Sequence, residues 1–168
     1  MSRPKVTLCM IVKDETHIIE ECLRSMAKYV DRYDITDTGS TDGTQEFIKD
    51  YFREKNIPGE LFEDKWQDFA YNRTKALEFA YKKTDFLFIF DADDRIVGDL
   101  KLPDLKKGFA YHMNFGWGVS WKRMPLLDNN IQWHYEGVMH EIIGTKEIYQ
   151  LASIEGNYHI ATNVEVSA

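Results

Sequence analysis

Residues 85–94 read DFLFIFDADD. The apolar run from Phe86 to Phe90 predicts a buried strand, and it ends abruptly in an acidic stretch. Asp91 and Asp93 lie two positions apart, so in an extended segment their side chains point to the same side. Two such carboxylates can bind one hard divalent cation, directly or through water. A solvated turn that caps a helix explains the same spacing, but the abrupt change from apolar to acidic residues favours a metal.

The chain before this stretch alternates between strand and helix patterns at short intervals. This alternation predicts an α/β fold with a mostly parallel sheet and helices on both faces. Residues 33–36 predict only a weak strand. Strands are predicted at residues 6–12, 33–36, 61–62 and 85–90, and helices at residues 18–26, 44–53 and 66–83.

Polar clusters follow three of these strands, at residues 13–15, 37–40 and 91–94. Parallel strands present their carboxyl ends at one edge of the sheet, where ligands bind, so the clusters should meet there. Asp37 stands at a strand end, where its carboxylate can accept hydrogen bonds from a ribose or a base. A well-capped loop without a ligand is the alternative, and it accounts for Thr41 and Asp42.

Two further charged residues, Asp68 and Arg73, lie at the start of the third helix. The planar guanidinium of Arg73 can reach a uracil or a phosphate, although a surface ion pair explains an isolated arginine equally well.

The sequence pattern changes after residue 98, where shorter strands are predicted at residues 109–115, 119–123, 148–152 and 156–160. No linker or repeat divides the chain, so we expect one domain over residues 1–168, with a change of role between residues 1–98 and residues 99–168. Residues 133–141 hold two histidines and two glutamates, which suit a general base or a metal ligand. His159 lies in a short apolar strand and reads first as a core residue, and His17 and His112 also read as structural.

Composition excludes some functions. A net charge of -7 argues against a broad affinity for nucleic acid polymers. The two cysteines, Cys9 and Cys22, predict buried free thiols in a reducing compartment. No apolar run approaches the roughly 18 residues of a membrane span, so we expect a cytoplasmic protein without a transmembrane segment.

Four motifs, taken in order, carry a family resemblance. They are LCMIVKDE at residues 8–15, DTGSTDGT at 37–44, WQDFAYNR at 66–73 and FDADD at 90–94. Together with residues 133–141, they resemble the family 2 glycosyltransferases of GT-A fold over nearly the whole chain. The resemblance implies a Rossmann-like nucleotide-diphospho-sugar transferase fold and the inverting transfer of a sugar, with a UDP-sugar as the donor. The acceptor would be a hydroxyl of a glycan, a protein or a small molecule.

The resemblance also implies roles for individual residues. Asp91 and Asp93 match the family's DxD motif, which holds Mn2+ or Mg2+ with the donor diphosphate. His159 matches a histidine that closes the metal site, and Glu141 falls where the catalytic base is placed. The donor-nucleotide site would comprise Val12, Asp14, Glu15, Asp37, Asp68, Arg73 and Ala92. Residues 1–98 would then form the donor-binding half of the domain, and residues 99–168 a short acceptor half.

Two other functions remain open at this stage. A nucleotidyltransferase also uses paired aspartates and a metal, but residues 13–15 lack the glycines and the basic charge of a triphosphate loop. A non-catalytic nucleotide- or glycan-binding module would suit the short acceptor half. The chain also departs from the family pattern, with Asp14 where asparagine is usual and Asp94 where glutamate is common. The strand at residues 33–36 is more polar than the family's usual apolar run, so we expect it to be exposed or short.

Overall fold

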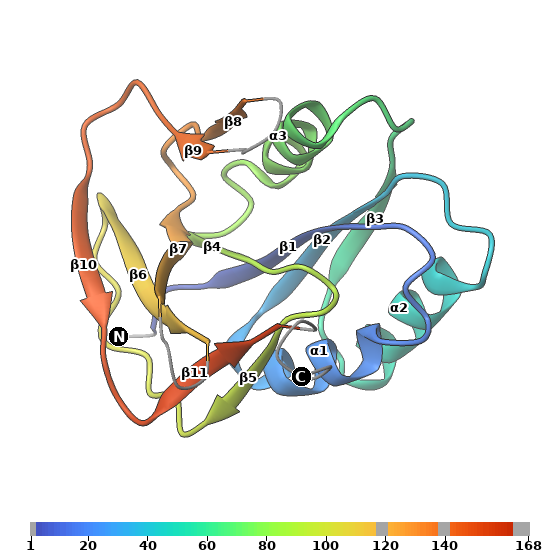
Figure 1. Cartoon of the computed structure of the whole chain (residues 1–168), viewed down its shortest axis with the longest axis horizontal. Coiled ribbons are helices and arrows are strands. Elements are labelled where there is room, and N and C mark those ends of the chain that lie inside the picture. The colour runs from blue at the N-terminus through green and yellow to red at the C-terminus, as the bar shows by residue number, and fades with distance from the viewer. Residues whose placement is uncertain (1–2, 117–120, 138–141, 163–168) are drawn as a thin grey trace.

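The computed structural model describes residues 3–116, 121–137 and 142–162, and these ranges form a mixed α/β structure around one large sheet (Figure 1). The helices are α1 (Ile19–Met26), the 3-10 turn η1 (Ala27–Tyr29), α2 (Thr44–Glu54) and α3 (Phe69–Ala80). The strands are β1 (Val6–Val12), β2 (Arg32–Asp37), β3 (Gly59–Glu63), β4 (Phe86–Ile89), β5 (Arg95–Gly98), β6 (Phe109–Phe115), β7 (Trp121–Asp128), β8 (His134–Glu136), β9 (Ile142–Gly144), β10 (Gln150–Ile154) and β11 (Tyr158–Ala161).

The order of the strands decides where a site can form. In the described ranges the sheet runs β3-β2-β1-β4-β7-β6-β11-β5, and β10 pairs with β6. The first four strands of this order are mutually parallel, whereas β7 is antiparallel to β4 and to β6. The mostly parallel sheet predicted from the sequence is therefore confirmed. The carboxyl ends of β1 to β4 share one edge, as ligand-binding α/β sheets require.

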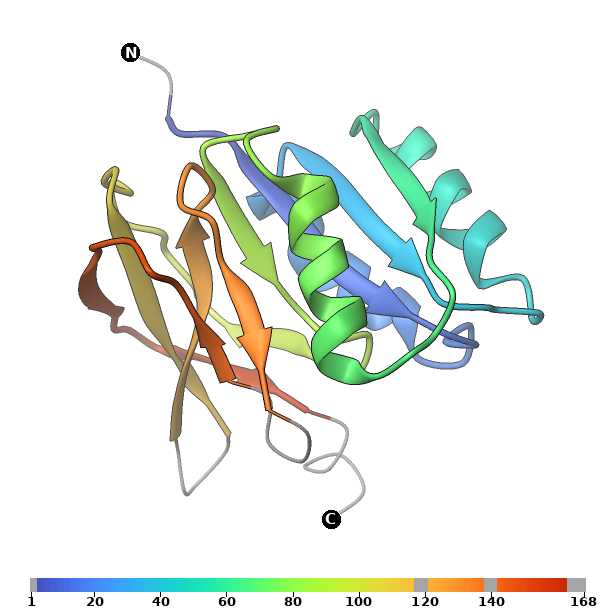
Figure 2. The same ribbon diagram turned by 90° about the horizontal axis from the view of Figure 1, so that it is seen from above.

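Side chains on the two faces of the sheet enter different apolar cores. Leu8 and Met10 pack in a core that includes residues of α1 and α2, such as Leu23. Cys9, between them in the chain, enters a second core with Ala76 of α3. Successive strand residues point to opposite faces, so α3 covers one face while α1 and α2 cover the other (Figure 2). Helices on both faces were predicted, and they are confirmed.

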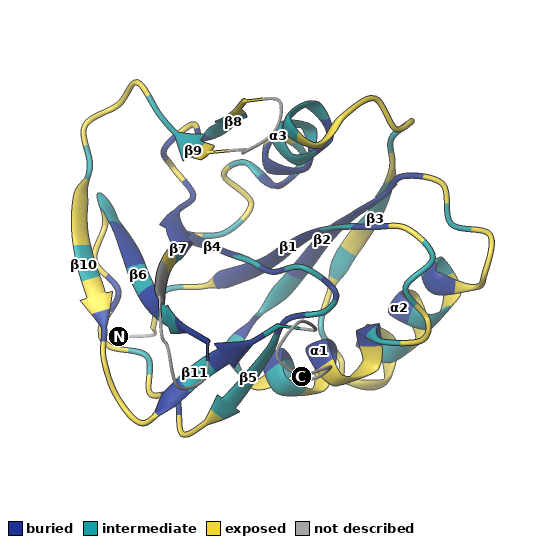
Figure 3. Cartoon of the chain, viewed as in Figure 1, coloured by how far each residue is buried: buried dark blue, intermediate teal, exposed yellow. Residues whose placement is uncertain are grey.

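The prediction that the second strand is exposed or short was wrong. β2 lies between β1 and β3, and five of its six residues are buried (Figure 3). Its polar character comes largely from Asp34, whose carboxylate accepts two hydrogen bonds from the Arg32 guanidinium at 3.0 and 2.9 Å. The Lys83 ammonium lies 3.8 Å from the same carboxylate. A buried charge that is paired in this way can be tolerated inside a sheet.

Helix α3 is shorter than its apolar pattern predicts. The predicted helix covered residues 66–83, but Asp68 has extended backbone angles and accepts a hydrogen bond from the Tyr71 amide at 2.7 Å. This cap begins the helix at Phe69. The helix ends at Ala80, and Lys82 soon afterwards adopts a left-handed conformation with φ of +62°.

From residue 95 onward, the structure holds strands that the sequence did not indicate. β5 and the β8–β9 hairpin were not predicted, and β7 extends five residues beyond the expected end at Arg123. Both cysteines are buried and free, as predicted. Across the described ranges, no helix is both long enough and apolar enough to span a membrane.

Candidate functional site

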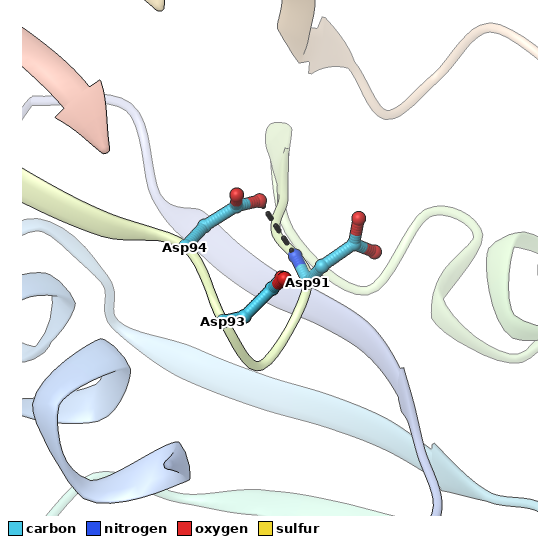
Figure 4. Close-up of side chains that lie close together, drawn as sticks. All are labelled: Asp91, Asp93 and Asp94. Carbon is cyan, nitrogen blue, oxygen red and sulfur yellow. Dashed lines mark hydrogen bonds between the residues drawn. The ribbon is translucent and has the colours of Figure 1, made fainter. Parts of the chain in front are cut away.

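The acidic stretch after β4 folds into a compact turn. Asp91, Asp93 and Asp94 each offer a carboxylate oxygen, and these oxygens lie within 4.8 Å of one another (Figure 4). The Asp94 carboxylate accepts a hydrogen bond from the Asp91 amide at 3.0 Å, and the Asp94 amide donates to the Asp91 carbonyl at 3.0 Å. Carboxylate oxygens are the ligands that Mg2+ and Mn2+ prefer, so the turn fits a hard divalent cation. Asp94 was not among the predicted ligands, and its position directly after Asp93 was the available signal.

Two arginines face this acidic group. The Arg73 guanidinium lies 2.8 Å from the Asp91 carboxylate, and the Arg123 guanidinium lies 3.3 Å from the Asp94 carboxylate. Burial raises the pKa of Asp94 to about 7, and the neighbouring Asp91 carboxylate acts in the same direction. Like charges held this close favour a bound cation, which would relieve their repulsion.

A cavity of about 430 Å³ opens beside the acidic turn, at the carboxyl edge of the sheet. This volume lies in the range of small-molecule sites. Burial raises the pKa of Glu15 in its wall, and the nearby Asp93 and Asp91 carboxylates add to the effect. The structure thus brings together, around one cavity, the predicted site residues Val12, Glu15, Arg73, Asp91, Ala92 and Asp93.

Hydrogen bonds join the loop after β1 to the loop after β2. The Asp14 amide donates to the Ser40 hydroxyl, and the Thr41 amide donates to the Asp14 carboxylate, both at 2.8 Å. The Glu15 amide donates to the Thr44 hydroxyl, also at 2.8 Å. Because residues 12, 13 and 15 line the cavity, these bonds set the shape of its wall.

Asp42 also joins the loop after β1 to the start of α2, because its carboxylate accepts hydrogen bonds from Thr16 and from Thr44. One carboxylate oxygen accepts bonds from the amide and the hydroxyl of Thr44, at 3.0 and 2.5 Å. The other accepts bonds from the amide and the hydroxyl of Thr16, at 3.2 and 2.8 Å. The same side chain therefore stabilises the first turn of α2 and the loop that follows β1.

Asp37 shapes its own loop. It is 1% exposed, and one carboxylate oxygen accepts bonds from the Gly39 and Ser40 amides, both at 2.8 Å. Its other oxygen is buried and has no hydrogen-bond partner in the described part of the chain. Gly39 allows this turn because its φ of +127° is unfavourable for other residues. Direct contact between Asp37 and a ligand stays a prediction.

Other predicted residues are not members of the acidic group or lie outside the described ranges. Asp68 is exposed and caps α3. His159 lies in β11, half-buried and opposite Val97 of β5, and the acidic group found among residues 3–116, 121–137 and 142–162 contains no histidine. Glu141 lies outside the described residues. The roles predicted for these three residues therefore stay predictions.

A second cavity, of about 550 Å³, adjoins the first. Arg73 and Asp91 line both cavities, so their ion pair stands between them. The Arg73 guanidinium lies 5.8 Å from the ring centre of Tyr135, which is in the wall of the second cavity, and 5.9 Å from that of Phe69, which is in the wall of the first. Arg123 also lines the second cavity, where its guanidinium stacks 3.9 Å from the ring centre of Phe115.

Comparisons with known proteins show which sequences this chain is similar to. Glycosyltransferase SunS of the Bacillus subtilis prophage SPbeta is 34% identical over 92 residues, which are 54% of this chain and 20% of that protein. A TPR repeat-containing protein of Synechococcus elongatus is 32% identical over 94 residues, which are 55% of this chain and 21% of that protein. The chain thus matches about a fifth of the length of these curated relatives.

Solved structures share the fold. A crystal structure of GalNAc-T7 with UDP, GalNAc and Mn2+ superposes with a TM-score of 0.55 at 13% identity, covering 76% of this chain and 26% of that one. TarS of S. aureus superposes with a TM-score of 0.52 at 19% identity, covering 68% of this chain and 23% of that one. The expected GT-A fold is therefore confirmed. The family model for glycosyl transferase family 2 matches residues 7–162, and the chain belongs to that family.

Proposed function

We propose that this chain is the catalytic domain of a metal-dependent glycosyltransferase that uses a nucleotide diphosphate sugar, with UDP as the nucleotide. The observation that carries the proposal is the acidic turn in the wall of the 430 Å³ cavity, at the carboxyl edge of the sheet of a family 2 fold. Such an edge is where α/β sheets bind nucleotides.

We place the donor in the 430 Å³ cavity with its diphosphate at Asp91 and Asp93. These two residues and Asp94 would hold Mn2+ or Mg2+, with His159 as the further ligand implied by the family resemblance. A bound divalent cation supplies neutralisation of the charge on the departing diphosphate. Arg73 already lies at this end of the cavity, where its guanidinium can bind a phosphate oxygen in place of Asp91.

We place the acceptor in the adjoining 550 Å³ cavity, which meets the first at the Arg73–Asp91 pair. In the proposed step, the acceptor hydroxyl oxygen attacks the anomeric carbon and gives its proton to the Glu141 carboxylate. The bond from the anomeric carbon to the diphosphate oxygen breaks, and its electron pair leaves with the nucleotide. A single displacement of this kind inverts the anomeric carbon. Positioning of the two substrates would supply much of the rate.

The setting we assign is the cytoplasm. Both thiols are unpaired in the fold, as is usual in a reducing compartment. The acceptor, whether a glycan, a protein or a small molecule, is the substrate that the reaction needs in addition to the donor.

Calorimetric titration of UDP, with and without Mn2+, tests the donor site. We expect UDP to bind tightly only with Mn2+, and Asp93→Ala to weaken this binding by at least about 10- to 100-fold, which is the loss caused by removing a residue that only supports a metal ligand. Asp50→Ala is the matched control, because Asp50 is an exposed aspartate on α2 that pairs with Arg53.

Two outcomes would count against the proposal. If UDP binds equally well without Mn2+, and Asp93→Ala leaves the affinity for UDP unchanged, the site does not use a metal. Metal-dependent UDP binding with no detectable release of UDP from any UDP-sugar, in the presence of candidate acceptors, would instead favour a non-catalytic nucleotide-binding module.

A further inference from the structure

Two aromatic side chains remain exposed at the cavity that we assign to the donor. Trp66, in the segment before α3, is 41% exposed, and Phe69, the first residue of α3, is 51% exposed. Both line the 430 Å³ cavity. Their rings meet edge to face, with 4.8 Å between centroids and 83° between planes. Exposed apolar surface gathered at a cavity marks a binding surface.

The strand order gives this cavity two ends. The acidic turn follows β4, Thr38 follows β2, and Trp66 follows β3, while the sheet runs β3-β2-β1-β4. Trp66 and the acidic turn therefore follow strands that are three places apart in the sheet. Figure 2 shows the segment after β3 leading from the edge of the sheet to the start of α3.

A continuous line of contacts connects these two ends along α3. The Trp66 ring packs on Phe69, the Arg73 guanidinium lies 5.9 Å from the Phe69 ring centre, and Arg73 pairs with Asp91 at 2.8 Å. Phe69 and Arg73 are four residues apart on one helix, so they lie on the same face. One wall of the cavity therefore runs from an aromatic pair, Trp66 and Phe69, to a charged pair, Arg73 and Asp91.

A nucleotide diphosphate sugar fits this polarity in one direction. The diphosphate belongs at the acidic turn, as the proposed function has it. The sugar is attached to the outer phosphate, so it lies at that end too. The ribose and the base extend the other way, toward Thr38 and Trp66. We propose that Trp66, supported by Phe69, is the stacking platform for the donor's nucleobase. This inference rests on the proposed function and adds a binding residue to it.

Binding of UDP and of pyrophosphate, each titrated calorimetrically with Mn2+, isolates the base. Trp66→Leu should weaken UDP binding about tenfold, the scale of one base–aromatic stack, and leave pyrophosphate binding within about twofold. Trp66→Phe keeps an aromatic face, so it should keep UDP affinity within about threefold. Ile148→Ala is the control, because Ile148 is 96% exposed and precedes β10.

Tryptophan fluorescence gives a second measurement that does not depend on the leucine variant folding. UDP, but not pyrophosphate, should change the emission of the wild type, and Trp66→Phe should lose this change while still binding UDP. Unchanged UDP affinity in Trp66→Leu, or a UDP-dependent signal that persists in Trp66→Phe, would overturn the platform and leave the donor site standing. Failure of the wild type to bind either ligand with Mn2+ would overturn the proposed donor site, and the platform with it.

Discussion

Two buried threonines offer the same isosteric change with opposite expected results. Thr44 and Thr36 are both 0% exposed. The Thr44 hydroxyl accepts a hydrogen bond from the Glu15 amide at 2.8 Å and donates one to the Asp42 carboxylate at 2.5 Å. The Thr36 hydroxyl has no hydrogen-bond partner among the residues that the structure describes. Replacing each residue by valine exchanges a hydroxyl for a methyl group of nearly the same size.

The magnitudes follow from what each hydroxyl leaves behind. Thr44→Val strands the part-buried Glu15 amide and removes a bond to a charged carboxylate, so we expect a loss of about 2 kcal/mol in the free energy of unfolding. Thr36→Val removes a buried hydroxyl whose desolvation is not offset, so we expect a gain of about 1 kcal/mol. Valine is tolerated at both positions, because its helix propensity is close to that of threonine and it favours strands.

Urea denaturation followed by circular dichroism measures both changes, provided that the slope of the transition is the same in all three proteins. The two variants should differ by about 3 kcal/mol, the sum of the two expected changes. If Thr44→Val is as stable as the wild type, the hydroxyl bridge between the two loops does not exist in solution. If Thr36→Val is destabilised by about 1 kcal/mol or more, the Thr36 hydroxyl makes a hydrogen bond in solution.

Three further predictions concern the loops and the thiols. Hydrogen bonds, chiefly from the Thr44 side chain, lower the pKa of Asp42. The contribution of the Asp42 carboxylate to stability should therefore be complete above pH ~4 and decline as the pH falls toward the lowered pKa. In urea denaturation, the free energy of unfolding of Asp42→Asn should differ less from that of the wild type at pH ~3 than at pH ~7. Asp14 has φ of +52°, and its carboxylate accepts a hydrogen bond from the Thr41 amide. Asp14→Ala should therefore lower the free energy of unfolding by about 1–2 kcal/mol in urea denaturation, whereas Asp14→Asn should stay within about 0.5 kcal/mol of the wild type. Equal losses in the two variants would contradict this reasoning. Burial raises the pKa of Cys9 to about 12 and also raises the pKa of Cys22. A disulfide reagent at pH ~8 should therefore modify neither thiol in the native protein and both thiols in urea. Rapid modification of the native protein would show that the core opens.

The sheet was largely predictable because its central strands are apolar runs that end in polar residues. β1 and β4 fall at the predicted positions for this reason. β2 was misjudged because a sequence pattern does not show that Asp34 meets Arg32 inside the sheet. β5 and the β8–β9 hairpin were missed because each of these strands has only three or four residues, too few to display a period.

The candidate site was predictable to the extent that strand ends converge. That convergence brings Asp91, Asp93 and Glu15 to one edge of the sheet, and all three line the same cavity. It does not show how a turn closes, so it does not identify the third carboxylate, that of Asp94. The convergence of strand ends also does not identify Trp66 as a site residue, because exposure at a cavity is a property of the folded chain.

The central position of β1 has a consequence for how the chain is made. Val6 pairs with Phe86, which lies 80 residues further along. At about 5–20 residues per second, the ribosome needs roughly 4–16 s to synthesise that interval. During this time β2 can cover one edge of β1, while the other edge, on one of the most apolar strands of the protein, has no partner. A chain truncated before β4 would keep this edge of β1 unpaired, and an unpaired apolar edge is a site at which chains aggregate.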